Sequence, residues 1–244
     1  MKQSVFITVV MIIATAISVA IYVYLLPDFI REGGPLVVAL LVLTLMVTTF
    51  IVERLFSLRK ARGKAELTTF LRKVQQFINA RNIDGAIKSC DEQRGSMANI
   101  IRTGLERYKH LTAEGEPRAA KDVMVDVQQA IEEAMMLEVP LLERNLIALS
   151  TIASIATMVG LLGTVIGMIR AFRALAHAGA VDAIQLSVGI SEALINTAGG
   201  LIAAIAGIVA YNYFTTRVDN FTYMIDEASY SIIQSLALKR DRKP

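Results

Sequence analysis

The sequence has few of the residues that build enzyme active sites and metal centres. Its 244 residues include one cysteine, two histidines and no tryptophan. The single cysteine, Cys90, excludes an intramolecular disulfide and argues against a cysteine-based metal site. No cluster of His, Cys and Asp and no nucleophile motif is present. We therefore expect no metal, no cofactor and no enzymatic activity.

Charge is scarce as well. Charged residues make up 19% of the chain, against about 25% in ordinary soluble domains. The formal net charge of +3 is too small to indicate nucleic-acid binding. What is present instead is apolar sequence, gathered in four blocks, each close to the roughly 20 residues that cross a bilayer.

These blocks predict an all-α integral membrane protein. It would have three core transmembrane helices, an extra N-terminal apolar helix, and long helices that extend into a cytoplasmic helical domain. We expect membrane helices over 1–27 and 35–52, a cytoplasmic domain over 53–145, a transmembrane pair with a short outer loop over 146–216, and a cytoplasmic helix with a basic tail over 217–244. A secretory signal peptide begins similarly, but its apolar core is shorter than this first block.

Basic residues beside the blocks predict the topology. One cluster follows the second block: Arg54, Arg59, Lys60, Arg62 and Lys64. Another ends the chain: Lys239, Arg240, Arg242 and Lys243. The positive-inside rule places both clusters in the cytoplasm, which gives four spans with both termini, including Lys2, inside. Arg170 and Arg173 at the outer end of the third span oppose the rule but are outnumbered. This is the topology of a multi-pass membrane protein.

The sequence of the polar middle of the chain, residues 53–145, predicts helices. Apolar residues recur there at spacings of three and four, with breaks expected at Gly95 and over 114–117. Four glutamates near its end could be mistaken for a carboxylate metal site: Glu132, Glu133, Glu138 and Glu143. Such a site needs histidines on the same face, and His110 and His177 lie too far away. A solvated helix face is the better interpretation.

The third and fourth blocks carry matching stripes of small residues. Stretches 146–169 and 193–216 contain no Asp, Glu, Lys or Arg. One stripe consists of Gly160, Gly163 and Gly167, and the other of Ala193, Asn196, Gly200, Ala204 and Gly207. Small residues let membrane helices approach closely. The stripes either pack the two helices together or line a narrow path, and the pattern does not distinguish these.

Three polar side chains in this pair are candidate functional groups: Thr164, Thr197 and Glu192. An ionisable group within a span is a functional candidate by default. If the last span begins near Ser187, Glu192 lies about 8 Å from the outer edge, within reach of water; the alternative is a carboxylate favoured by the helix N-terminus. A membrane threonine can equally bond its own backbone one turn back.

Two motifs in this region carry a family resemblance. GLLGTVIGMIRAF (160–172) and GISEALINTAGGLIAAI (189–205), preceded by a polar helical domain, resemble the MotA/TolQ/ExbB proton-channel family. The resemblance implies a homo-pentamer whose last two spans line a pore. A dimer of a single-span ExbD/TolR-like subunit would sit in that pore and supply a membrane aspartate, and a TonB/TolA-like protein would receive the work.

On this sequence Thr164 and Thr197 match the family's pore threonines, and Glu192 matches its acidic position near the outer end of the last span. Threonine hydroxyls can hydrogen-bond a carboxyl group in either protonation state. The family role implied for Glu192 is structural or path-shaping rather than proton-carrying.

The additional N-terminal segment departs from ExbB and TolQ, which usually have three spans. Four spans resemble MotA, yet the cytoplasmic domain is short and neither core span contains the proline expected of MotA. We therefore expect an ExbB/TolQ-like subunit that uses the proton motive force for outer-membrane transport or envelope maintenance. The alternatives are a MotA-like flagellar stator subunit and a membrane scaffold that conducts no ions.

Overall fold

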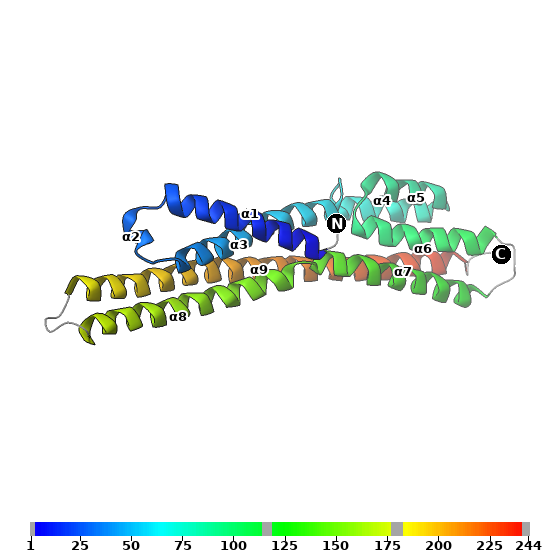
Figure 1. Ribbon diagram of the computed structural model, residues 1–244. Coiled ribbons are helices and arrows are strands. Elements are labelled where there is room, and N and C mark those ends of the chain that lie inside the picture. The colour runs from blue at the N-terminus through cyan, green and yellow to red at the C-terminus, as the bar shows by residue number, and fades with distance from the viewer. Residues whose placement is uncertain (1–2, 114–118, 177–182, 241–244) are drawn as a thin grey trace. The chain divides into compact units, whose positions relative to one another are not determined.

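The computed structural model describes residues 3–113, 119–176 and 183–240 (Figure 1). In these residues the chain is helical, with short turns and no strand. The helices are α1 (Gln3–Tyr24), α2 (Asp28–Arg31), α3 (Leu36–Arg62), α4 (Leu67–Asn79), α5 (Ile83–Gln93), α6 (Ser96–Ala113), α7 (Ala120–Glu143), α8 (Leu146–Ala176) and α9 (Ala183–Arg240).

Four helical segments of the described residues are long and apolar enough to cross a membrane. They lie in α1, in α3 with α4, in α7 with α8, and in α9. The predicted all-α membrane fold, with an apolar helix ahead of three others, is therefore confirmed.

The helices continue beyond the apolar blocks. Long helices were predicted, and α3 runs past residue 52, the expected end of the span, to Arg62, while α9 is a single helix of 58 residues. Lysine and arginine are good helix formers, and Arg59, Lys60 and Arg62 occupy the last turn of α3, where a helix C-terminus favours positive charge. An apolar block thus marks the span and not the helix.

The breaks between helices have local causes. Gly95, at φ +94°, separates α5 from α6 where a break was predicted, and Asn145, at φ +67°, separates α7 from α8. The segment 27–35, between the first two predicted membrane helices, includes one helical turn, α2. The break predicted over 114–117, His177 and the last tail residues Arg242 and Lys243 lie outside the described residues.

The chain forms two compact units. The first comprises Met1–Glu53 and Asn145–Phe214, and the second Arg54–Arg144 and Thr215–Pro244. In the first unit, large apolar side chains of the spans face outward, including Ile12, Met158, Leu194 and Ile202, each more than 60% exposed. Such an apolar surface is suited to contact with lipid hydrocarbon and is unusual on a protein surface that faces water.

The second unit has an apolar core of its own. Its fully buried side chains come from several helices and include Val74, Ile78, Met97, Ile101, Leu105, Val127, Ile225 and Ile232. The side chain of Gln93 ties the turn after α3 to α5, because its Oε1 accepts from the amide of Ala65 at 3.0 Å and its Nε2 donates to the carbonyl of Ala65 at 2.9 Å. Arg54, 1% exposed, donates from Nη1 to the carbonyl of Leu142 at 3.0 Å.

Cys90 belongs to this core, and we expect its thiol to be unreactive in the folded protein. The residue is 2% exposed. Burial, with a smaller contribution from Asp91, raises the pKa of the thiol from 9.0 to about 12. Because the thiolate is the reactive form, labelling at pH 8 by a thiol reagent should be at least about a hundredfold slower in the folded protein than after unfolding in SDS. Complete labelling of the folded protein within minutes would contradict this burial; mass spectrometry measures the modified fraction.

Candidate functional site

The α8–α9 pair is closed by contacts between small residues. A Cβ added to Gly200 would lie 2.7 Å from both the carbonyl oxygen of Ala156 and the Cα of Gly160. One added to Gly167 would lie 2.7 Å from the backbone nitrogen of Ala193. The two backbones are therefore in direct contact along this line, as membrane helices with small residues at their interface can be.

The structure brings the two predicted stripes together. Gly160 faces Gly200 and Asn196, Gly163 faces Asn196, and Gly167 faces Ala193. Further along, Gly207 faces Ala153, and Ala204 lies with Ala156 and Ala203 in a buried cluster against Leu43 of α3. Within one chain, the stripes form the helix contact.

Asn196 is held inside this contact. It is fully buried, and its Nδ2 donates to the carbonyl of Gly33 at 2.8 Å. Gly163 leaves room for it, because a Cβ there would overlap the Cβ of Asn196. Its Oδ1 has no hydrogen-bond partner. Asn196 therefore connects α9 to the turn that precedes α3.

Glu192, one helical turn before Asn196, forms an ion pair with Arg170 of α8. The Nη1 of Arg170 lies 2.6 Å from each carboxylate oxygen. The side chain of Glu192 is 3% exposed, whereas that of Arg170 is 53% exposed. The expectation that water reaches Glu192 is therefore wrong for this chain. The N-terminal interpretation is wrong too, because α9 already runs from Ala183, and the helix dipole acts within the first turn.

The two threonines donate to backbone carbonyls. Thr197 donates to the carbonyl of Ala193 at 3.1 Å, with a longer contact of 3.5 Å to the carbonyl of Gly160 across the helix pair. Thr164 donates to the carbonyl of Leu161 at 2.6 Å. Since each hydroxyl uses its proton in this way, its oxygen can still accept a hydrogen bond.

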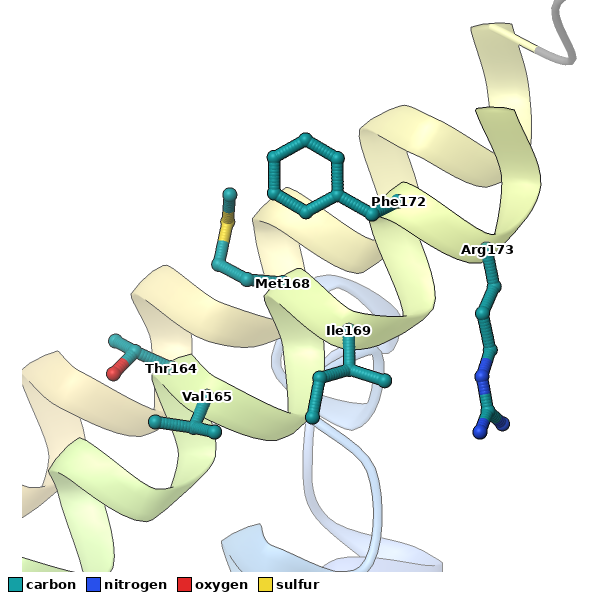
Figure 2. A pocket seen from close by; sticks show the side chains of 6 residues that line it. All are labelled: Thr164, Val165, Met168, Ile169, Phe172 and Arg173. Carbon is teal, nitrogen blue, oxygen red and sulfur yellow. The ribbon is translucent and has the colours of Figure 1, made fainter. Parts of the chain in front are cut away.

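Thr164 lies in a shallow groove on the exposed face of α8. Figure 2 shows Thr164, Met168 and Phe172 following one another along this helix, with Val165, Ile169 and Arg173 beside them. Apart from Thr164 and Arg173 the lining is apolar. The groove gives Thr164 an open side, whereas Thr197 is half-buried against α8.

Sequence reasoning missed the partner of Glu192. Arg170 was interpreted only as a charge that opposes the positive-inside rule. A charged residue in a span usually pairs with another, and this could have pointed to Arg170, but the register of α8 against α9 was needed to select it over Arg173.

The glutamates of α7 bind neighbouring side chains. Glu132 accepts from Gln128 at 2.9 Å, Glu133 from Gln129 at 3.0 Å and Glu138 from Asn99 at 2.9 Å, all at exposed positions. Within residues 3–113, 119–176 and 183–240, no group of three or more His, Cys, Asp and Glu side chains is arranged to hold a metal ion. These contacts fit a solvated helix face.

Comparison with known proteins supports one family. Residues 92–227 match the model of the MotA/TolQ/ExbB proton channel family. The Tol-Pal system protein TolQ of Pseudomonas aeruginosa is 34% identical over 192 residues, which cover 76% of this chain and 81% of that protein.

Two other relatives extend the likeness. The TolQ protein of Haemophilus influenzae is 28% identical over 75% of this chain and 82% of its own length. The biopolymer transport protein ExbB of Neisseria gonorrhoeae is 23% identical over 86% of this chain and 96% of its own length. The family match includes α8, the Arg170–Glu192 pair and most of α9. This multi-pass membrane protein therefore belongs to the MotA/TolQ/ExbB proton channel family.

Proposed function

We propose that the chain is the multi-spanning subunit of a proton-driven motor in the bacterial inner membrane, one that energises outer-membrane transport or envelope maintenance. The observation that carries the proposal is the α8–α9 pair, in which two threonine hydroxyls keep free acceptor lone pairs next to a tightly closed helix contact. The names of the relatives, Tol-Pal system and biopolymer transport proteins, support the same role.

The chain needs a partner for this function. Stretches 146–169 and 193–216 contain no Asp or Glu, so a proton carrier at mid-membrane depth has to come from another subunit. We propose a dimer of a single-span ExbD/TolR-like subunit with a membrane aspartate, inside a pentamer of this chain whose termini are cytoplasmic. Thr164 and Thr197 would hydrogen-bond that aspartate, and a TonB/TolA-like protein would receive the movement.

The proposal is tested by proton flux into liposomes. The chain is co-purified with its single-span partner, and flux is driven by a potassium diffusion potential and read with a pH-sensitive dye. We expect flux only when both proteins are present, and none when the partner's aspartate is replaced by asparagine. Equal flux without the partner, or with the asparagine variant, would contradict the proposal.

The four spans also fit a MotA-like stator subunit, and deletion of the gene separates the two. Loss of iron-complex uptake or of envelope integrity supports the ExbB/TolQ-like role. Loss of motility alone supports the stator. A complex that assembles with its partner but shows no proton flux in the liposome assay supports the non-conducting scaffold.

A further inference from the structure

Three parts of the first unit meet at Glu192: α8, α9 and the Glu32–Gly34 turn between α2 and α3. Arg170 reaches the carboxylate from α8. From the turn, the carbonyl of Gly33 accepts from Asn196, and a carboxylate oxygen of Glu32 accepts from the hydroxyl of Ser191 at 3.1 Å.

The turn lies directly against the carboxylate. Gly34 has φ +72°, and a Cβ built there would lie 2.8 Å from Oε1 of Glu192. Only glycine fits this position without strain. The turn and Arg170 together leave the carboxylate almost without contact with solvent.

The two charges of the pair are not equally buried. Glu192 is 3% exposed and Arg170 is 53% exposed at the side chain. Removing one partner of a buried pair leaves the other charge uncompensated, whereas removing both charges can be nearly neutral. Loss of Arg170 therefore leaves a buried carboxylate without a cation, while loss of Glu192 leaves a guanidinium that can turn to water.

We propose that Arg170 is a positioning residue: as the counter-charge that allows Glu192 to stay buried, it fastens α8 and the Glu32–Gly34 turn to α9 and so holds Thr197 in place. On this view the Arg170–Glu192 pair is an anchor, and Glu192 carries no proton. The inference rests on the proposed function for its flux readout only.

The test is a double-mutant cycle on partner-dependent flux. We expect Arg170→Gln to lower flux by at least about tenfold and Glu192→Gln by no more than about threefold. Only the first substitution leaves a buried charge without its partner. The double variant Arg170→Gln/Glu192→Gln should return to within about threefold of the wild type, since two amides can still hydrogen-bond. Arg102→Gln, which removes ion pairs between exposed side chains of the second unit, is the control and should keep full flux, because exposed pairs contribute little.

Two results would overturn the proposal. If Glu192→Gln abolishes flux and the double variant is equally inactive, Glu192 carries protons and Arg170 does not act through it. If Arg170→Gln leaves flux unchanged, Arg170 positions nothing.

A second readout needs no partner and no flux. The melting temperature of the detergent-solubilised chain should fall in the same order, by at least about 5 °C for Arg170→Gln, with recovery in the double variant. If this order is observed while the wild-type complex conducts no protons, the anchor stands and the proposed function fails. If the melting temperature of Arg170→Gln equals that of the wild type, the anchor proposal is wrong, whatever the flux measurement gives.

Discussion

Thr197→Val is expected to lower partner-dependent proton flux by at least about tenfold, while the chain still folds and assembles. Valine nearly keeps the shape of threonine but loses the hydroxyl, whose oxygen is free to accept after donating to Ala193. A hydrogen bond to a charged group contributes about 1.5–3 kcal/mol, which corresponds to roughly a ten- to hundredfold loss of rate. The measurement is the liposome flux assay with the single-span partner.

Two variants make this result specific. Thr197→Ser keeps a hydroxyl at the same place and should retain most of the flux. Thr44→Val removes a hydroxyl of α3 that donates to the carbonyl of Leu40 at 2.8 Å in the same way, and it should have no effect. Flux at the wild-type level in Thr197→Val, or an equal loss in Thr44→Val, would exclude a special role for Thr197.

Gly200→Ala is expected to destabilise the α8–α9 pair. The new methyl group would meet the backbone of Ala156 and Gly160 at 2.7 Å, so the helices would have to separate. Overpacking of this kind costs about 1–3 kcal/mol, which exceeds the gain of up to about 1 kcal/mol from replacing glycine by alanine in a helix. Unfolding of the solubilised protein in SDS, followed by circular dichroism, measures the difference.

The neighbouring glycine is the control. A Cβ at Gly199 would meet only the side chain of Leu40, with Cδ1 at 3.2 Å, and the end of a leucine side chain can move. Gly199→Ala should therefore be neutral or slightly stabilising. Equal destabilisation by both substitutions would mean that the close contact at Gly200 is not what holds the pair.

The sequence was a good guide to the spans and to the helical character of the segments between them, and a poor guide to where the individual helices end. Apolar length predicts a membrane helix because the bilayer imposes it, and all four spans were found in this way. Helix ends were less accessible, because nothing in a bilayer requires a helix to stop at the membrane surface, and α3 continues to Arg62.

The site was predictable in composition and not in pairing. The small residues of both stripes were visible because small-residue spacing is periodic. That Arg170 binds Glu192, and that the carbonyl of Gly33 receives Asn196, depends on how two helices and a turn are aligned in space. No local pattern encodes that alignment.

In the proposed motor, the contact between α8 and α9 also limits where a moving surface can lie. Where the two backbones touch at Gly160–Gly200 and at Gly167–Ala193, neither residue has a side-chain rotamer to change, so these contacts cannot repack into a second arrangement. A force on one of these helices therefore displaces both helices together, as one rigid body. A sliding surface of that motor would lie where long side chains can rearrange, and on α8 the exposed long side chains include Leu161, Met168 and Phe172.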